Sequence, residues 1–335
     1  MLFVLALVQA ITGPPSISGA VRGAESREPL GFSIVTLVPG ARRRFTDAAG
    51  AFQFDSLAAG TYVLSVRQIG YAPLDTQIVV RDGRPAVVQI ALRHLAIELP
   101  PVTVAAGRCT TPGPPDSSDT ALRAVFDQLE ENARRFELLA DSYPFRYTLS
   151  LSVRDVSLRG DTTPTGQKRI ELSSANDHPY HVGRVVEPAW GPWGNPDSFV
   201  VIHSAELRDL GTAEFVANHC FHLGGRDTLE GHPLLRIDFE PAVRIHSADM
   251  AGAAYLDPES YALRYTATVL TRPGRSSLSA DVSGMTFRAR FRDIAPGVPV
   301  QDSLTAITTY RYGRRAKIDT QRTLDVRFLR RPPDH

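Results

Sequence analysis

The sequence has 335 residues, which is enough for two ordinary domains that each bury a core. Apolar residues make up 43% and charged residues 22%, a balance typical of a folded globular protein rather than a disordered or coiled-coil chain. The 37 Lys and Arg nearly balance the 36 Asp and Glu, so we expect no nucleic-acid partner and no global attraction to an anionic bilayer.

The chain begins with an apolar run from Met1 to Val8. A membrane span needs about 20 apolar residues, so we expect no transmembrane span. Small residues at Val8 and Ala10 match the positions before a signal cleavage site, and residues 1–10 are therefore predicted to be a signal peptide. Because no Lys or Arg precedes the run, a buried first strand is the alternative.

Residues 14–105 show short strands separated by Gly, Pro and Asp turn signals, without helical periodicity. Tyr62, Leu64 and Val66 alternate with their neighbours, and the segment 86–92 repeats this pattern. Gly50 ends the turn before one strand and supplies the positive φ that a tight corner needs. Two half-buried sheets of this kind predict a β-sandwich.

The order of these segments resembles the carboxypeptidase regulatory-like, transthyretin-related domain family. The resemblance rests on residues 17–21, 29–38, 46–54, 57–66 and 69–71. It implies a seven-stranded sandwich, with a carbohydrate-binding-like fold, used as an accessory or scaffold module in exported proteins. It implies no catalysis, because the peptidase chemistry of that family belongs to a separate zinc domain, and we expect no cofactor.

Residues 106–118 are rich in Pro and predict a stiff linker. Asp119 can cap the helix that follows, which we expect over residues 119–140. The apolar residues of this segment fall on one helical stripe. They are Leu122, Val125, Phe126, Leu129, Ala133, Phe136 and Ala140.

From Phe145 the pattern returns to strands, and residues 119–335 are predicted to form one helix plus a large antiparallel sheet or half-barrel. Alternating apolar rows occur at 147–153 and 285–291, and residues 253–269 predict a hairpin around a turn at 257–260. A helix followed by such a meander resembles the envelope lipoprotein carriers of the LolA/LolB type. That resemblance implies a concave sheet able to hold an acyl chain.

The two cysteines, Cys109 and Cys220, predict one disulfide, since an even count in an exported chain favours pairing. Such a bond would clamp the linker onto the C-terminal domain. Two unpaired thiols or a thiolate nucleophile are the alternatives, and no motif accompanies either.

Seven of the nine histidines lie between positions 178 and 246. His178 and His181 are three residues apart, as are His219 and His222, and imidazole with thiolate is a zinc ligand set. Residues three apart in a strand point to opposite faces, so each pair needs a turn to converge. The default interpretation is surface histidines or histidines with structural hydrogen bonds, and no metal site is favoured.

Trp190 and Trp193 lie in a Gly- and Pro-rich segment that we expect to be a loop. Paired loop aromatics can stack on a sugar or anchor a protein partner. A loop that folds back on the end of the barrel is the competing interpretation.

These observations predict a non-catalytic exported protein of the periplasm or outer membrane, or a secreted one, that acts as a binding or scaffold module for an envelope protein, a glycan or a lipid. The first alternative is a carrier of a lipid or other apolar ligand, with a half-barrel C-terminal domain. An apolar lining on the concave face would support the carrier, and a packed interior would exclude it. The second alternative is a zinc-dependent hydrolase that uses the histidines of residues 178–246.

Overall fold

The computed structural model describes residues 15–82, 84–97, 108–175, 179–190, 196–204, 206–278, 280–313, 315–330 and 332, and only the backbone of residues 188–190 and 196–201. The chain forms two compact units, one up to Leu95 and one from Ala96 to Pro332. The predicted signal peptide, residues 1–10, lies outside the described residues. Within the described part of the chain, no helix is long and apolar enough to span a membrane.

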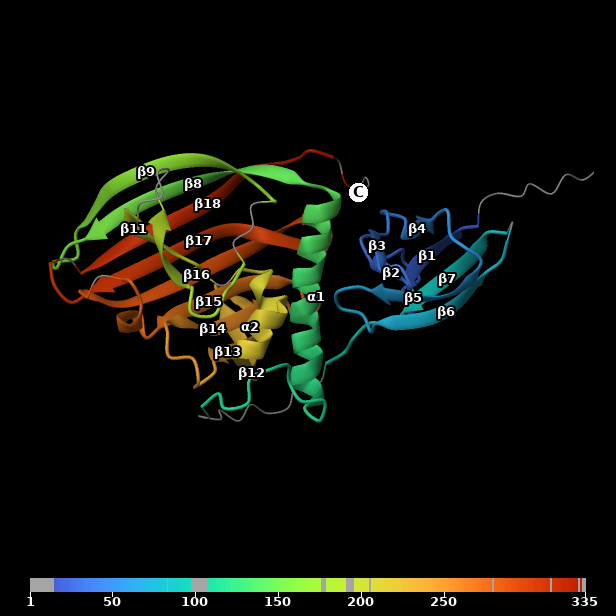
Figure 1. The fold of residues 1–335 in the computed structure, drawn as a ribbon, viewed down its shortest axis with the longest axis horizontal. Helices are drawn as coiled ribbons and strands as arrows, with labels where there is room; N and C mark the ends of the chain where they lie inside the picture. The colour runs from blue at the N-terminus through green and yellow to red at the C-terminus, as the bar shows by residue number, and fades with distance from the viewer. Residues whose placement is uncertain are drawn as a thin grey trace, which may run out of the picture. The chain divides into compact units, whose positions relative to one another are not determined.

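The N-terminal unit is a sandwich of seven strands in two sheets (Figure 1). One sheet has the order β4-β1-β7, in which β1 pairs in parallel with β7, and the other has the order β3-β2-β5-β6. The strands are β1 (Ile17–Gly23), β2 (Ile34–Val38), β3 (Arg42–Phe45), β4 (Ala51–Phe54), β5 (Gly60–Arg67), β6 (Leu74–Val80) and β7 (Ala86–Leu92).

Side chains from both sheets fill the interior of the sandwich. Phe54 of β4 and Leu64 of β5 are fully buried in one cluster, to which every strand except β3 contributes. Gly50 closes the turn before β4 with φ of 75°, and a Cβ there would collide with the carbonyl oxygen of Val21. The alternation seen in the sequence therefore marks the inner faces of a closed, packed sandwich.

The C-terminal unit begins with the predicted helix, α1 (Thr120–Ser142). Asp119 is its N-cap, and its carboxylate accepts a hydrogen bond from the backbone N–H of Leu122 at 3.0 Å. The helix ends before Pro144. Its buried face includes Phe126 and Leu129 and packs against β12, β13 and β17 of the large sheet.

The large sheet has nine strands and is fully antiparallel (Figure 1). Its order is β12-β13-β14-β15-β16-β17-β18-β8-β9, with β12 and β9 at the two edges, so it is not a closed barrel. The strands are β8 (Phe145–Val156), β9 (Thr162–Ser173), β12 (His219–Leu229), β13 (His232–Pro241), β14 (Asp249–Leu256), β15 (Leu263–Thr271), β16 (Val282–Ala295), β17 (Val298–Tyr310) and β18 (Ala316–Phe328).

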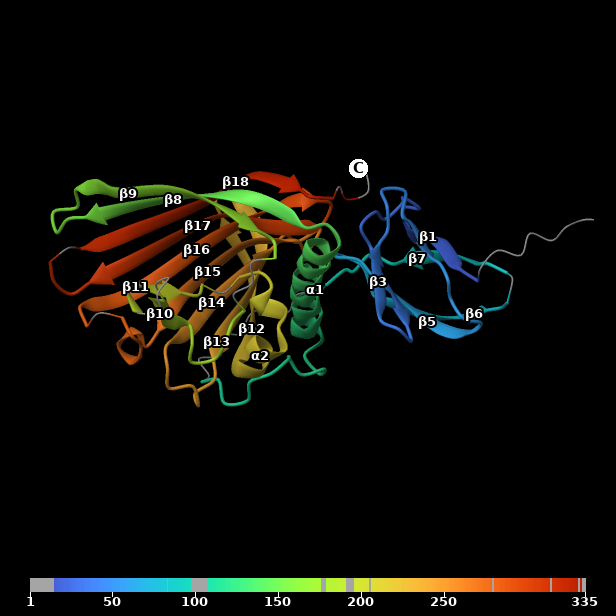
Figure 2. The same cartoon turned by 45° about the horizontal axis from the view of Figure 1, so that its top comes forward.

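The hairpin of β10 (Val186–Trp190) and β11 (Pro196–Ile202) and the short helix α2 (Ala213–Asn218) lie over the concave side of this sheet (Figure 2). A turn of 3₁₀ helix, η1 (Asp209–Gly211), lies between them in the chain. A second 3₁₀ turn, η2 (Pro273–Arg275), precedes β16. The fold class predicted from the sequence is confirmed: a mainly β chain with a seven-stranded sandwich, one long helix and a large antiparallel sheet.

The large sheet is wider than one helix can cover. α1 has 23 residues, which makes it about 34 Å long but only about 10 Å wide. Nine strands about 4.8 Å apart span about 38 Å, and the 14 residues of β16 extend for about 47 Å. α1 can therefore cover only one strip of the concave face.

Candidate functional site

A cavity of about 1060 Å³ lies on the concave face of the large sheet. It is bounded by β8, β9, β16, β17 and β18, by Phe136 of α1, by residues 277, 278, 281 and 282, and by residues 202–208 apart from 205. We call residues 202–212, without residue 205, the covering segment. Ligand-binding pockets for small molecules are commonly about 300–1,000 Å³, so this cavity is large enough for a ligand of lipid size.

Just over half of the residues that line the cavity are apolar. On β8, Tyr147, Leu149, Leu151 and Val153 face the cavity, and on β16 the side chains of Met285, Phe287 and Phe291 do so. Both rows are the alternating apolar rows that the sequence predicted for one face of a strand. Leu304 and Ala306 of β17 continue the apolar surface between them. The concave face is thus lined with apolar side chains around an open space rather than filled by a packed core.

The strand β18 contributes the longest polar stretch of the wall. On β18, Lys317, Asp319, Gln321 and Thr323 line the cavity at alternating positions, and we call these four residues the β18 polar row. In the sheet register Asp319 stands between Ala306 of β17 and Val153 of β8, and Gln321 stands between Leu304 and Leu151. The middle of the polar row, Asp319 and Gln321, therefore has apolar side chains on both sides.

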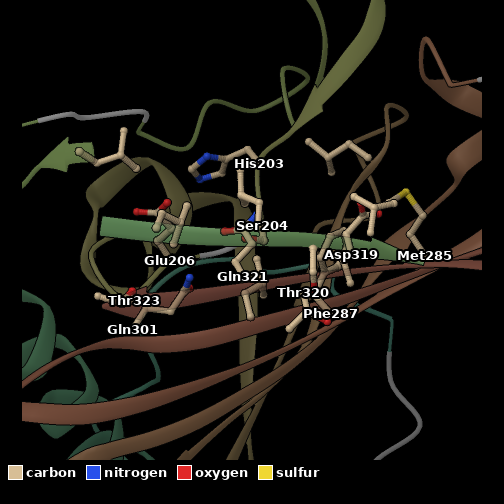
Figure 3. A pocket seen from close by; sticks show the side chains of 18 of the residues that line it. His203, Ser204, Glu206, Met285, Phe287, Gln301, Asp319, Thr320, Gln321 and Thr323 are labelled. Atoms are coloured by element: carbon tan, nitrogen blue, oxygen red, sulfur yellow. The ribbon is translucent and has the colours of Figure 1, made fainter. Parts of the chain in front are cut away.

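Figure 3 shows part of the polar row together with Gln301 of β17. His203 and Ser204 of the covering segment lie on the other side of the cavity in this view. These residues were not predicted from the sequence to line a ligand site. The available signal was the alternation of polar side chains along residues 317–323, which is equally typical of a strand face exposed to solvent.

A buried aspartate holds the covering segment in place. The carboxylate of Asp209 is fully buried and accepts hydrogen bonds from the backbone N–H groups of Tyr180, at 3.0 Å, and Glu206, at 2.7 Å. His203 Nε2 lies 2.7 Å from Asp209 Oδ2, which is the oxygen that accepts the hydrogen bond from Glu206. Because His203 and Glu206 both line the cavity, Asp209 fixes the position of cavity-facing groups without facing the cavity itself.

The helix α1 is fixed to the sheet by a buried arginine. Arg135 is fully buried, and it donates hydrogen bonds to the carbonyl oxygens of Gly297, at 2.7 Å, and Pro296, at 3.3 Å, in the β16–β17 turn. Burial disfavours the charged guanidinium and lowers the pKa of Arg135 to about 10. The next residue, Phe136, forms part of the cavity wall, so this contact positions one end of the cavity.

Two of the charged side chains of the cavity wall form an ion pair. Lys317 Nζ lies 3.1 Å from Asp319 Oδ1 within the β18 polar row. Burial raises the pKa of Tyr147. The negative charge of Glu206 raises this pKa further, and the positive charge of Arg208 lowers it. Asp281 also belongs to this wall, and its buried Oδ1 atom has no hydrogen-bond partner in the part of the chain that the structure describes.

The structure contains the predicted disulfide between Cys109 and Cys220, the second residue of β12. Both cysteines are buried, together with Ala242 and Ile245. The backbone carbonyl of Cys109 accepts a hydrogen bond from Val243 at 2.9 Å, and the N–H of Gly113 donates to His219 O at 3.0 Å. The described end of the predicted linker is therefore bound to the edge of the large sheet, and Cys220 is not available as a metal ligand.

The described candidate metal ligands do not form a cluster that could coordinate a metal ion. His219 is fully buried, and its ring nitrogens lie 2.8 Å from Phe215 O and 3.1 Å from Met250 O. His222 lies near Glu240, at 3.6 Å, and His181 near Glu214, at 3.0 Å. Within the described residues, no three His, Cys, Asp or Glu are placed to hold a metal ion, and His178 lies outside them.

The predicted tryptophan loop is only partly described. Trp190 is the last residue of β10, where the sequence indicated a loop, because the hairpin continues through its pairing with Pro196. Trp193 lies outside the described residues. A role of the two tryptophans in binding a ligand or partner stays a prediction.

Comparison with known proteins supports the assignment of the N-terminal unit. Residues 16–93 match the family model of the carboxypeptidase regulatory-like domain, within the range 14–105 that the sequence indicated. The N-terminal unit is therefore a domain of this type. No curated protein matches the sequence.

Three solved structures resemble the C-terminal part at low similarity. A DUF1329 family protein from Desulfovibrio piger is 10% identical with a TM-score of 0.32, and the match covers 62% of this chain and 93% of that protein. A domain from Vibrio parahaemolyticus, classed with outer-membrane lipoprotein-sorting proteins, is 11% identical with a TM-score of 0.34 (61% and 93% covered). A LolA superfamily protein from Nitrosomonas europaea is 8% identical with a TM-score of 0.30 (62% and 94% covered). TM-scores this low do not support a functional assignment.

Proposed function

We propose that this chain binds a lipid or another apolar ligand in the cavity of its C-terminal unit and acts as a carrier in the bacterial envelope. The observation on which the proposal rests is the apolar lining of the concave face around a cavity of about 1060 Å³. Burying an acyl chain against such a wall is favourable by about 0.8 kcal/mol for each CH₂ group removed from water. The proposal assigns binding rather than catalysis to the cavity.

Export is part of the same proposal. A disulfide that closes a loop between residues 111 positions apart is typical of proteins that fold in an oxidising compartment, such as the bacterial periplasm. The apolar start of the sequence supports export to that compartment. The N-terminal sandwich would then serve as an accessory module that presents the carrier to an envelope protein or glycan.

Native mass spectrometry of the full chain, expressed with export to a bacterial periplasm, tests the proposal. We expect a lipid-sized adduct that dissociates on collisional activation. Ala306, on β17, lines the cavity, so Ala306→Trp should fill part of it and remove the adduct. Ile307→Trp is the matched control, because Ile307 is the next residue on the same strand and its side chain is exposed.

Both variants are also compared by thermal unfolding, so that loss of ligand is not confused with loss of the fold. Ala306→Met, a smaller change, gives a second test if Ala306→Trp unfolds. A wild-type protein with a bare polypeptide mass that also fails to take up added lipid would contradict the proposal. Equal lipid binding by Ala306→Trp and Ile307→Trp would place the lipid outside the cavity and contradict it as well.

A further inference from the structure

The polar groups of the cavity wall differ in how completely the protein satisfies them. The charged groups of the β18 polar row, Lys317 and Asp319, pair with each other at 3.1 Å. In contrast, the structure gives no hydrogen-bond partner among the described residues to the amides of Gln301 and Gln321 or to the hydroxyl of Thr323. Within the β18 polar row and at Gln301, the groups that remain available to a ligand are thus uncharged.

Amide and hydroxyl side chains recognise particular ligand groups. Gln offers both a donor and an acceptor, and Thr offers a hydroxyl that does either. These groups match ester, amide and hydroxyl functions. They do not compensate the desolvation of a full negative charge in an apolar cavity, which is costly without a partner cation. Because Lys317 is already paired with Asp319, a fatty-acid carboxylate would have to compete with a carboxylate of the protein.

We propose that the cavity selects an uncharged amphiphile that has ester, amide or hydroxyl groups, in preference to a fatty-acid anion or a plain hydrocarbon, and that the β18 polar row with Gln301 is the selecting subsite. This inference rests on the proposed function, since it names the class of ligand for the same cavity. The apolar side chains on both sides of Asp319 and Gln321 hold the hydrocarbon parts of the ligand, and the row contacts its polar groups.

The test compares three ligands of matched chain length on the delipidated full chain at pH 8. They are 1-monolauroylglycerol, which is uncharged and has an ester and two hydroxyls, sodium laurate, and dodecane. Two or three hydrogen bonds, each about fivefold in affinity, predict that monolauroylglycerol binds at least about tenfold more tightly than laurate. Dissociation constants are measured by titration and native mass spectrometry.

The double variant Gln301→Leu/Gln321→Leu should weaken the binding of monolauroylglycerol about tenfold and leave dodecane binding within about twofold. Gln77→Leu/Gln89→Leu is the matched control, because it makes the same chemical change at two exposed strand positions of the N-terminal unit. We expect the control to bind all three ligands as the wild type does.

The outcomes separate the two proposals. If laurate binds as tightly as monolauroylglycerol, or if the cavity double variant keeps the wild-type preference, the assignment of the ligand class is wrong while lipid binding stands. If none of the three ligands binds to the wild type, lipid binding in the cavity is itself wrong and the inference fails with it.

Discussion

The two β-rich units differ in what covers the apolar faces of their sheets. In the N-terminal unit, two sheets of three and four strands face each other, and their side chains form one closed cluster that includes Phe54 and Leu64. In the C-terminal unit, a nine-stranded sheet has α1 and the covering segment on its concave side, and a cavity of about 1060 Å³ remains. The same alternating pattern thus produces a packed core in one unit and a cavity wall in the other.

The difference shows that period-two alternation fixes which side chains share a face but not what that face contacts. When a second sheet of similar size covers a sheet, the facing apolar side chains form a packed core. A sheet too large for its covering helix keeps apolar side chains that line a cavity. Apolar residues on the concave face of the large sheet are therefore expected to contribute more to binding and less to stability than those of the sandwich.

The largest expected effect concerns the disulfide, which belongs to the C-terminal unit alone. Cysteines 111 positions apart close a long loop, so Cys109→Ser/Cys220→Ser should lower the free energy of unfolding of that unit by up to about 4–5 kcal/mol. Both tryptophans of the chain lie in this unit, so tryptophan fluorescence during urea unfolding reports on it selectively.

The sandwich should be unaffected by that change. Circular dichroism during urea unfolding reports on both units. The unfolding of the sandwich is the change in this signal that does not coincide with the change in tryptophan fluorescence. A destabilisation of both transitions by the same amount would show that the two units unfold together, and the comparison between them would then be wrong.

A matched pair of leucines tests the comparison directly. Leu64→Ala removes a fully buried side chain from the sandwich and should cost about 2–5 kcal/mol of unfolding free energy, because it leaves a void in a packed core. Leu151→Ala makes the same change in a wall that already faces open space, and we expect a cost below about 2 kcal/mol in ligand-free protein.

Adding the bound lipid should separate the two leucine variants further. Wild-type protein and Leu64→Ala should gain equal stability in the C-terminal transition, and Leu151→Ala should gain less, because its ligand contacts are reduced. Urea unfolding with and without 1-monolauroylglycerol measures this gain. An equally large cost for both substitutions without ligand would indicate that the concave face is packed as tightly as the sandwich.

A smaller effect is expected at the covering segment. Asp209→Asn turns one acceptor that faces backbone N–H groups into a donor, and we expect a loss of about 1–3 kcal/mol together with faster dissociation of the ligand. Stopped-flow measurement of ligand release gives the rate.

Asp302→Asn is the matched control for this substitution, since Asp302 pairs with Arg292 at 2.8 Å and both side chains are partly exposed. Exposed ion pairs contribute about 0–1 kcal/mol, so this variant should release ligand as the wild type does. Unchanged release from Asp209→Asn would show that the covering segment does not control access to the cavity.

The sequence predicted the features that depend on local chemistry. The N-cap at Asp119, the rows 147–153 and 285–291 and the turn at 257–260 follow from hydrogen bonding within a few residues and from strand alternation, and the structure contains all of them. The disulfide follows from cysteine count and expected compartment rather than from geometry.

The cavity could not be predicted in the same way. Lys317, Asp319, Gln321 and Thr323 have the pattern of a solvated strand face, and whether such a face meets water or a cavity depends on the curvature of the sheet and on pairings between strands far apart in the sequence. The burial of His219 between two backbone carbonyls likewise depends on α2 and β14, so the histidine spacing alone could not show which histidines have structural hydrogen bonds.

The smallest expected effect is at the β14–β15 turn. The Asp257 carboxylate accepts hydrogen bonds from the backbone N–H of Ser260, at 2.8 Å, from its hydroxyl, at 2.9 Å, and from the N–H of Glu259, at 3.1 Å. Partial burial raises the pKa of Asp257, but these hydrogen bonds outweigh burial, and the pKa is lowered below its ordinary value.

A pKa that is lower in the folded than in the unfolded state means that ionised Asp257 stabilises the fold above the unfolded-state pKa of about 3.9, and that this contribution is lost as the pH falls through the folded-state pKa. Asp257→Ala should therefore lower the free energy of unfolding by about 0.5–1.5 kcal/mol at pH 7, seen in the tryptophan transition, and the difference from wild type should shrink below about pH 4.

Asp47→Ala is the control in the sandwich. It removes a comparable turn contact, in which the Asp47 carboxylate accepts a hydrogen bond from the Ala51 N–H at 2.8 Å, and it should leave the tryptophan transition unchanged. Asp47→Ala could instead lower the midpoint of the tryptophan transition as much as Asp257→Ala does. The two units would then unfold together with one free energy of unfolding, and a substitution in the apolar wall that changes binding would also change the stability of the sandwich.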